Sequence, residues 1–137
     1  MRRRAFYFCP WRTHSRHDSR EREMEIDFRK MDGLVPVVVQ DDANGELLMV
    51  GFANAEAYRN TLDSGYVTFF SRTRQKLWVK GETSGNRLRV TSAATDCDND
   101  CLLFRVTVEG DGVVCHEGTR SCFTKKIEIP AVAVEAR

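Results

Sequence analysis

Two β-branched runs joined by an Asn-Gly turn constrain the fold of this 137-residue chain more than any other feature. The runs span residues 34–40 and 47–52, and Asn44-Gly45 lies between them. Asn-Gly is the strongest short-range signal for a β-hairpin. Proline has no N–H for a central strand, so Pro36 predicts that the first run is an edge strand.

The rest of the chain predicts further strands and one clear helix. Asn54 can cap a helix over residues 55–63, and Gly65 can end it in a left-handed turn. Short apolar runs predict strands at residues 66–71, 77–80, 87–95, 101–108, 113–116 and 126–129. The sequence therefore predicts a β-rich α+β fold, with a mostly antiparallel sheet and one or two short helices.

Charge is distributed unevenly along the chain. Residues 1–23 carry seven Lys/Arg and three Asp/Glu, whereas the whole chain has a net charge of +1. So small a net charge lacks the positive field of a nucleic-acid-binding protein, and we expect no nucleic-acid partner. The first 17 residues contain five Arg and no acid, which is also typical of organelle transit peptides. We expect instead a disordered basic leader over residues 1–31, with the fold beginning near Met24 or Asp32 and one domain over residues 32–137.

No apolar run approaches the roughly 20 residues of a membrane span, and the leader has no apolar segment of a secretory signal. We therefore expect no membrane partner and a cytoplasmic location. In a reducing compartment, the five cysteines are more typical of metal ligands or buried thiols than of disulfides.

The stretch Asp96-Cys97-Asp98-Asn99-Asp100 is rich in metal-ligating side chains. If it is extended, the three aspartates lie on one face of the strand and the cysteine points to the other. Carboxylates suit Mg²⁺ or Ca²⁺ and thiolates suit Zn²⁺, so the two faces could hold different metals. The alternative is a solvated acidic turn at the end of a strand.

Four cysteines outside the leader, Cys97, Cys101, Cys115 and Cys122, are spaced by 4, 14 and 7 residues, so no C-x₂-C pair of a zinc finger occurs. In a strand, Cys101 would lie roughly 13 Å from Cys97, and it precedes an apolar run typical of the core. Three thiolates with one open position describe a catalytic zinc better than a structural one. Buried, inert cysteines are the alternative. His116 could act as a base beside Cys115, or it could be an ordinary surface histidine.

A basic turn carries cations next to an aromatic ring and a glycine-containing loop. Arg72, Arg74 and Lys80 could bind phosphate, and Trp78 could stack on a purine. A solvated hairpin tip is the alternative interpretation. The small net charge favours a small phosphorylated ligand over a polymer.

Three motifs occur together and in order: FSRTR with KLWVKGETSG at residues 70–74 and 76–85, DCDND at 96–100, and CHEGTRSCF at 115–123. Together they closely resemble the phosphoribosyl-AMP cyclohydrolase family of histidine biosynthesis, over roughly residues 33–123. The resemblance implies an intertwined homodimer whose zinc sites are shared between subunits. It also implies the monofunctional form, in which the preceding pyrophosphohydrolase step comes from another protein.

The resemblance also implies a set of site residues. One Zn²⁺ per subunit would be held by Cys115, Cys122 and the partner subunit's Cys97. One Mg²⁺ per subunit would be held by Asp96, Asp98 and Asp100. We assign substrate binding to Arg72, Arg74, Trp78, Lys80, Glu82 and Ser84, and we nominate His116 as the catalytic base.

The implied reaction is the hydrolytic opening of the adenine ring of 1-(5-phosphoribosyl)-AMP at the C6–N1 bond, which gives an imidazole carboxamide. Zinc would make water available as hydroxide near neutral pH, and Mg²⁺ would help to bind the substrate phosphate. Two other classes stay open on the residues alone. A structural zinc module would have no use for the three aspartates, and a nucleobase deaminase would release ammonia.

Overall fold

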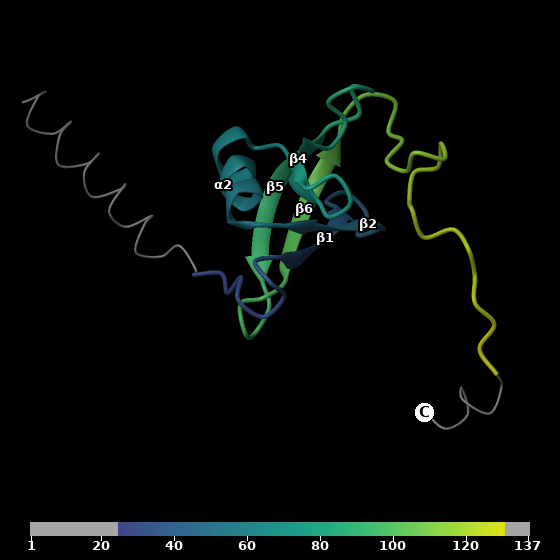
Figure 1. The fold of residues 1–137 in the computed structure, drawn as a ribbon. Helices are drawn as coiled ribbons and strands as arrows, with labels where there is room; N and C mark the ends of the chain where they lie inside the picture. The colour runs from purple at the N-terminus through teal and green to yellow at the C-terminus, as the bar shows by residue number, and fades with distance from the viewer. Residues whose placement is uncertain (1–24, 131–137) are drawn as a thin grey trace, which may run out of the picture.

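The computed structural model of the protein describes residues 25–130. The secondary-structure elements in chain order are strands β1 (Val35–Asp41) and β2 (Leu47–Ala53), helix α2 (Ala55–Ser64), and strands β3 (Thr68–Ser71), β4 (Lys76–Val79), β5 (Leu88–Thr95) and β6 (Leu102–Val108) (Figure 1). Most of the predicted leader lies outside these residues, so its disorder stays a prediction. No helix in the described part of the chain combines the length and the apolar character needed to cross a bilayer.

The strands form two sheets. The larger sheet has the order β2-β1-β6-β5, and the smaller one pairs β3 with β4. Neighbouring strands are antiparallel except β1 and β6, which are parallel. The predicted β-rich α+β fold is confirmed, with one helix among the described residues. The homodimer stays a prediction.

The edge position predicted for the first strand is wrong, because β1 lies between β2 and β6. Pro36 is opposite Phe52 of β2, and the pairing with β6 begins only at Val37. A proline at the second residue of the strand therefore lies just outside the pairing with β6. The absence of its N–H therefore removes no hydrogen bond between β1 and β6.

Local signals set both ends of helix α2 as predicted. The Asn54 side chain accepts a hydrogen bond from the Ala57 backbone N–H at 2.8 Å. Gly65 ends the helix at φ 82°, and its N–H donates to the Thr61 carbonyl. The Thr61 hydroxyl also accepts a hydrogen bond from the Thr68 backbone N–H at 2.9 Å, which fixes the buried face of α2 against β3. Such an N-cap contributes about 1 kcal/mol to stability.

The core lies against one face of the larger sheet. Alternate residues of β1 (Val35, Val37, Val39) are fully buried, as period-2 alternation requires. Phe69 of β3 is 1% exposed and lies across Gly51 of β2. A Cβ atom at Gly51 would be 2.6 Å from the Phe69 ring, so the smaller sheet can approach the larger one only over a glycine.

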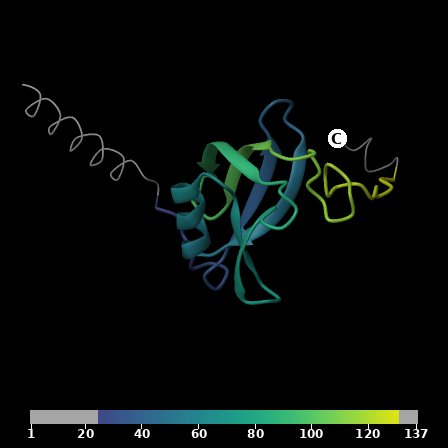
Figure 2. The same cartoon turned by 90° about the horizontal axis from the view of Figure 1, so that it is seen from above.

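The strands predicted at residues 113–116 and 126–129 are wrong, since the described chain after β6 contains no helix or strand. This segment leaves the body on the side away from α2, as Figures 1 and 2 both show. Ile127 is 84% exposed and Ile129 is 61% exposed. Their alternation with polar residues is typical of a strand, but in a single chain no strand lies beside them.

The segment before β1 packs on the body. Ile26 and Phe28 contact the core, and the Phe28 ring centroid lies 6.2 Å from that of Tyr58. The Asp27 backbone N–H donates to the Asn99 carbonyl at 2.7 Å. These contacts fit the earlier of the two predicted boundaries, near Met24.

Candidate active site

Residues 96–100, the acidic turn, connect β5 to β6. They form a turn and not the extended strand considered from the sequence. The Asp96 N–H donates to the Cys101 carbonyl at 3.1 Å, which closes the turn. Asn99 has a φ of 64°, a conformation that asparagine tolerates better than most residues. Because the chain reverses here, the 13 Å spacing expected between Cys97 and Cys101 in a strand does not apply.

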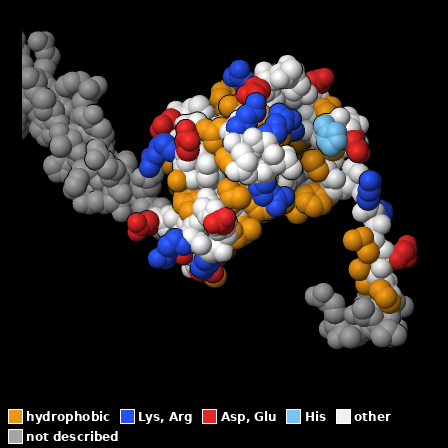
Figure 3. Space-filling view, in the orientation of Figure 1, with side chains coloured by type: hydrophobic (Ala, Val, Ile, Leu, Met, Phe, Trp, Pro, Cys, Tyr) orange, Lys and Arg blue, Asp and Glu red, His pale blue; other side chains and the backbone are white. Residues whose placement is uncertain are grey.

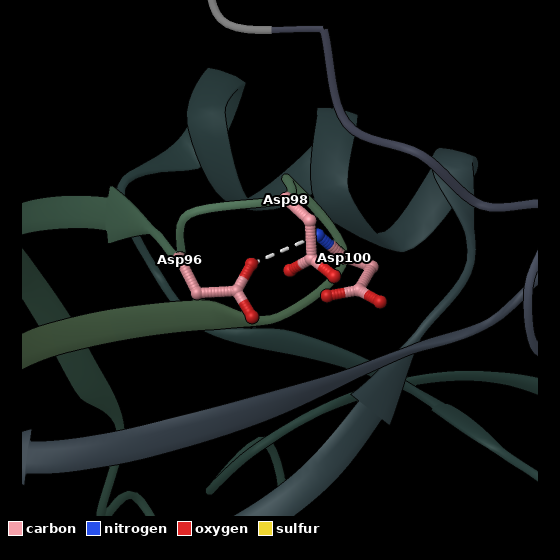
Figure 4. A group of neighbouring side chains, drawn as sticks. All are labelled: Asp96, Asp98 and Asp100. Atoms are coloured by element: carbon pink, nitrogen blue, oxygen red, sulfur yellow. Dashed lines mark hydrogen bonds between the residues drawn. The ribbon is translucent and has the colours of Figure 1, made fainter.

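The turn brings the three aspartates together, although by a different route from strand alternation. One carboxylate oxygen from each of Asp96, Asp98 and Asp100 lies within 4.8 Å of the others (Figure 4). The Asp96 carboxylate also accepts a hydrogen bond from the Asp100 N–H at 3.0 Å, which orients it. Three converging carboxylates are a donor set that suits Mg²⁺ or Ca²⁺.

A lysine from the segment before β1 partly neutralises this cluster. Lys30 Nζ lies 2.9 Å from Asp98 Oδ2 and 3.1 Å from Asp100 Oδ2. The Lys30 ammonium lowers the pKa of Asp98. Lys30 also acts to lower the pKa of Asp100, but the neighbouring carboxylates of Asp98 and Asp96 leave it raised. The turn therefore still carries uncompensated negative charge.

Residues 115–122, the thiol loop, fold back on themselves after β6. The N–H groups of Val114 and Cys115 both donate to the Thr119 carbonyl, at 3.2 and 2.9 Å. The Cys122 N–H donates to the Leu48 carbonyl of β2 at 2.8 Å, which attaches the end of the loop to the sheet.

Cys115 and Cys122 lie at the two ends of the thiol loop, and their interaction contributes to shifts of their pKa values in opposite directions. The Glu117 backbone N–H lowers the pKa of Cys115, with help from Thr119 and Cys122. Partial burial of its sulfur and the neighbouring Cys115 raise the pKa of Cys122, which is otherwise an exposed residue. Two neighbouring thiols fit two positions of a zinc site.

A hollow of about 320 Å³ lies beside the thiol loop. Its wall combines Cys115 and His116 with four of the residues predicted to bind substrate, namely Trp78, Lys80, Glu82 and Ser84. The His116 side chain is 88% exposed. Figure 3 shows a group of Lys and Arg side chains on one face of the body. Residues far apart in the sequence therefore meet at one surface depression.

The hollow's other wall is held by packing and by a tight loop. The Trp78 ring lies 5.3 Å from the Phe69 ring, so the indole is fixed on the core. Lys80 Nζ lies 5.4 Å from the Trp78 ring and acts to lower the pKa of Cys122. Gly81 has a φ of 81°, and a Cβ atom there would lie 2.3 Å from the Asn86 backbone. This loop closes only with glycine at that position.

Two predicted substrate residues are not part of this wall. Arg72 and Arg74 follow β3 at the tip of the β3–β4 hairpin. The Arg72 guanidinium lies 4.0 Å from the centre of the Phe52 ring, a cation–π contact on the body of the protein. Their role in substrate binding stays a prediction.

The acidic turn and the thiol loop lie at opposite ends of β6 (Figure 1). Seven residues of strand at about 3.3 Å each separate them by roughly 20 Å. Cys97 therefore cannot join Cys115 and Cys122 within one chain. Among the described residues of the chain, only the three aspartates form a complete group of metal-ligating side chains. Cys101 is a poor alternative to Cys97 as a zinc ligand, because burial and the nearby aspartates raise the pKa of its thiol.

Sequence reasoning missed three residues that shape these regions. Lys30 was assigned to the leader, and no local signal marks it as a partner of the aspartates. Asp41 and Arg120 form an ion pair across 79 residues of sequence. The sequence shows only that Asp41 directly follows the predicted strand over residues 34–40.

Comparison with known proteins identifies the family. Residues 49–124 match the model of the phosphoribosyl-AMP cyclohydrolase family. The chain is 52% identical over 105 residues to a phosphoribosyl-AMP cyclohydrolase of Solibacter usitatus, covering 77% of this chain and 82% of that protein. It is 51% identical over 113 residues to the histidine biosynthesis bifunctional protein HisIE of Bacteroides thetaiotaomicron, and 57% identical over 103 residues to that of Escherichia coli K12. These matches cover 82% and 75% of this chain, but only 55% and 50% of the two bifunctional proteins.

These matches identify the chain as a hydrolytic enzyme. The chain belongs to the phosphoribosyl-AMP cyclohydrolase family, and with it to histidine biosynthesis. The resemblance read from the three motifs is thereby confirmed.

Proposed function

We propose that this protein opens the adenine ring of 1-(5-phosphoribosyl)-AMP at the C6–N1 bond, at a composite site formed by two copies of the chain. One observation carries this proposal: a single hollow combines the thiol loop with Trp78, Lys80, Glu82 and Ser84. A purine nucleotide needs an aromatic surface, a cation for phosphate and polar groups at the ring edge. The hollow offers all three beside a reactive pair of thiols.

Each wall residue has a role that follows from its position. Trp78 is fixed against Phe69, so it can stack on the purine without losing side-chain freedom. Lys80 lies beside that ring and places a positive charge near the bound nucleotide. Glu82 and Ser84 are exposed on the loop that follows, where they can accept or donate hydrogen bonds at the ring edge.

The reaction needs activated water and a group that takes its proton. Zinc, when bound by Cys115, Cys122 and the partner subunit's Cys97, lowers the pKa of water toward neutrality. His116 is exposed on the wall of the hollow, with its Nε2 4.0 Å from the Glu117 carboxylate, and can accept a proton from water that attacks C6. The ring nitrogen N1 then leaves C6, and the exocyclic amine stays as the carboxamide.

The distance between the two regions supports the homodimer. Cys97 lies within the acidic turn, at the other end of β6 from the thiol loop. A second copy that supplies Cys97 to the hollow necessarily brings its three aspartates as well. Mg²⁺ on these aspartates would then lie near the substrate phosphate, where it offsets charge. We propose one Zn²⁺ and one Mg²⁺ per subunit, and a cytoplasmic location because the substrate is a phosphorylated nucleotide.

Ultraviolet spectroscopy of the purified protein with phosphoribosyl-AMP tests the proposal. We expect the absorbance change of ring opening without release of ammonia, its loss after chelation, and its return when zinc is added back. A spectral change with ammonia release would instead indicate a deaminase. No spectral change from folded, zinc-loaded protein would overturn the assignment of this reaction to the chain.

A further inference from the structure

The side chain of Asp41 is an acidic group in the interior. Asp41 is 3% exposed at the end of β1, where it is opposite Val106 of β6. One carboxylate oxygen accepts a hydrogen bond from the Ala43 N–H at 2.8 Å, inside the β1–β2 turn. A carboxylate withdrawn from water is costly unless a positive charge pairs with it. A single backbone N–H does not supply that charge.

Arg120 supplies the charge, and it does so from the middle of the thiol loop. Its Nη2 donates to the other carboxylate oxygen of Asp41. Its Nη1 donates to the Gly112 carbonyl at 2.8 Å, and its Nε lies 3.4 Å from Glu46 Oε1. Each of the three guanidinium nitrogens thus contacts a different residue. A lysine ammonium could not make these contacts in the same geometry.

The thiol loop has few other attachments to the body. Ser121 Oγ donates to the Leu47 carbonyl at 2.8 Å, and the Cys122 N–H donates to the Leu48 carbonyl, both at the C-terminal end of the loop. The loop itself contains no strand or helix, and most of its residues are exposed. Zinc–sulfur bonds are about 2.3 Å long, so two ligands from one irregular loop must already be held in position for tight binding.

We propose that Arg120 is a positioning residue, which holds the thiol loop on the buried carboxylate of Asp41 so that Cys115 and Cys122 are arranged to bind one zinc ion. This inference rests on the proposed zinc site at these two thiols. Arg120 itself neither binds the metal nor contacts substrate. It acts through the ion pair with Asp41, which is the last residue of β1.

The test is the zinc affinity of the full-length protein, measured by competition with a chromophoric chelator. Arg120→Gln should raise the zinc Kd by about 10-fold or more, the usual effect of removing a group that orients a metal ligand. Arg120→Lys keeps the positive charge but not the planar guanidinium, and it should recover part of the lost zinc affinity. Arg105→Gln is the matched control, since Arg105 pairs with the adjacent Asp42 but lies outside the thiol loop. Its zinc Kd should match that of the wild type.

Asp41→Asn tests whether Arg120 acts through the carboxylate. It should raise the zinc Kd by a similar factor, and adding it to Arg120→Gln should change little more, because the two residues act as one unit. It also keeps the proposal testable if Arg120→Gln does not fold. Thermal unfolding of the metal-free variants separates the positioning role from a structural one.

Three outcomes decide the matter. A raised zinc Kd for folded Arg120→Gln and Asp41→Asn, with an unchanged control, supports the proposal. A lower Tm with wild-type zinc affinity would mean that the ion pair only stabilises the fold, which overturns it. If Cys115→Ser and Cys122→Ser also bind zinc like the wild type, the proposed zinc site itself fails, independently of Arg120.

Discussion

The acidic turn and the thiol loop are the two regions proposed to bind metals, and they are held in place in different ways. The acidic turn is closed by hydrogen bonds within its own backbone, and it also contacts the segment before β1 through the Asp27 N–H and the partly exposed Lys30 ammonium. The thiol loop depends on bonds to the β1–β2 hairpin, among them the ion pair of Arg120 with buried Asp41. We infer that the acidic turn is less sensitive than the thiol loop to changes in residues far from it in sequence.

The largest expected effect tests whether the two regions meet between copies. Cys97→Ser and Cys115→Ser should each abolish turnover, because each removes one ligand from every zinc site. If the two variants are unfolded together and refolded, half of the dimers contain one chain of each kind. In such a dimer, one zinc site takes Cys97 from the Cys115→Ser chain and Cys115 from the Cys97→Ser chain, so it is intact. The other site lacks both thiols. Mixing should then restore about a quarter of wild-type activity. Activity that stays at zero after mixing would show that both thiols serve the same chain.

His116→Ala should lower kcat by about 100-fold at neutral pH, the usual contribution of a general base. The loss should shrink at high pH, where hydroxide is plentiful. Glu128→Gln removes an exposed charge beyond the thiol loop and serves as the control, with an expected kcat near wild type. A pH–rate profile of His116→Ala parallel to that of the wild type would remove His116 from the role of base.

Asp41→Asn should lower the free energy of unfolding at pH 7 by about 2 kcal/mol, as removal of a charged hydrogen-bond partner does. Burial acts to raise the pKa of Asp41, but the Ala43 N–H and Arg120 outweigh it and hold the pKa below its ordinary value. The stabilisation is therefore complete above the unfolded-state pKa of about 3.9, and it is lost as the pH falls through the lower folded-state value. Urea unfolding at several pH values checks this, with Asp42→Asn as the exposed control. A difference independent of pH would contradict it.

Asp98→Asn should weaken Mg²⁺ binding by about 10-fold, because affinity for hard cations follows the number of charged ligands. The zinc content of the purified protein should not change, since this substitution leaves all three proposed zinc thiols in place. Isothermal titration with Mg²⁺ and metal analysis measure the two quantities separately. Loss of zinc in this variant would show that the two regions are not independent.

Lys30→Met should have the smallest effect, a Mg²⁺ affinity about 2- to 5-fold higher, in line with the energy of an exposed ion pair. The Lys30 ammonium competes with a metal for Asp98 and Asp100. Arg29→Met is the matched control, because Arg29 pairs with Asp27 instead. Weaker Mg²⁺ binding by Lys30→Met would mean that the lysine holds the acidic turn in shape instead of competing for it.

Local signals in the sequence predicted the parts of the fold that local interactions determine. The Asn-Gly hairpin and the Asn54 and Gly65 caps of α2 depend on neighbouring residues, and the structure has them where expected. The position of β1 was predicted wrongly, because its second partner β6 follows about 65 residues later and leaves no mark near Pro36. Periodicity likewise predicted a strand at residues 126–129, where the chain provides no partner strand.

The candidate site follows the same rule. Two of the three motifs contain most of the residues that line the hollow, so the sequence alone pointed to Trp78 and Cys115. The residues that hold these regions in place, Lys30, Asp41 and Arg120, come from segments that only the folded chain brings together. A single sequence contains no local pattern for such pairs.

The parallel pairing of β1 with β6 has a consequence for how the protein is made. The β1–β2 hairpin is complete once residue 53 has been synthesised, but β1 gains its second neighbour only when residues 102–106 are available. Until then one edge of a strand rich in buried valines is unpaired, and such edges pair readily with other chains. Long-range parallel contacts also form slowly. Refolding yield should therefore fall as protein concentration rises, and the nascent chain is most exposed to aggregation between the synthesis of β2 and that of β6.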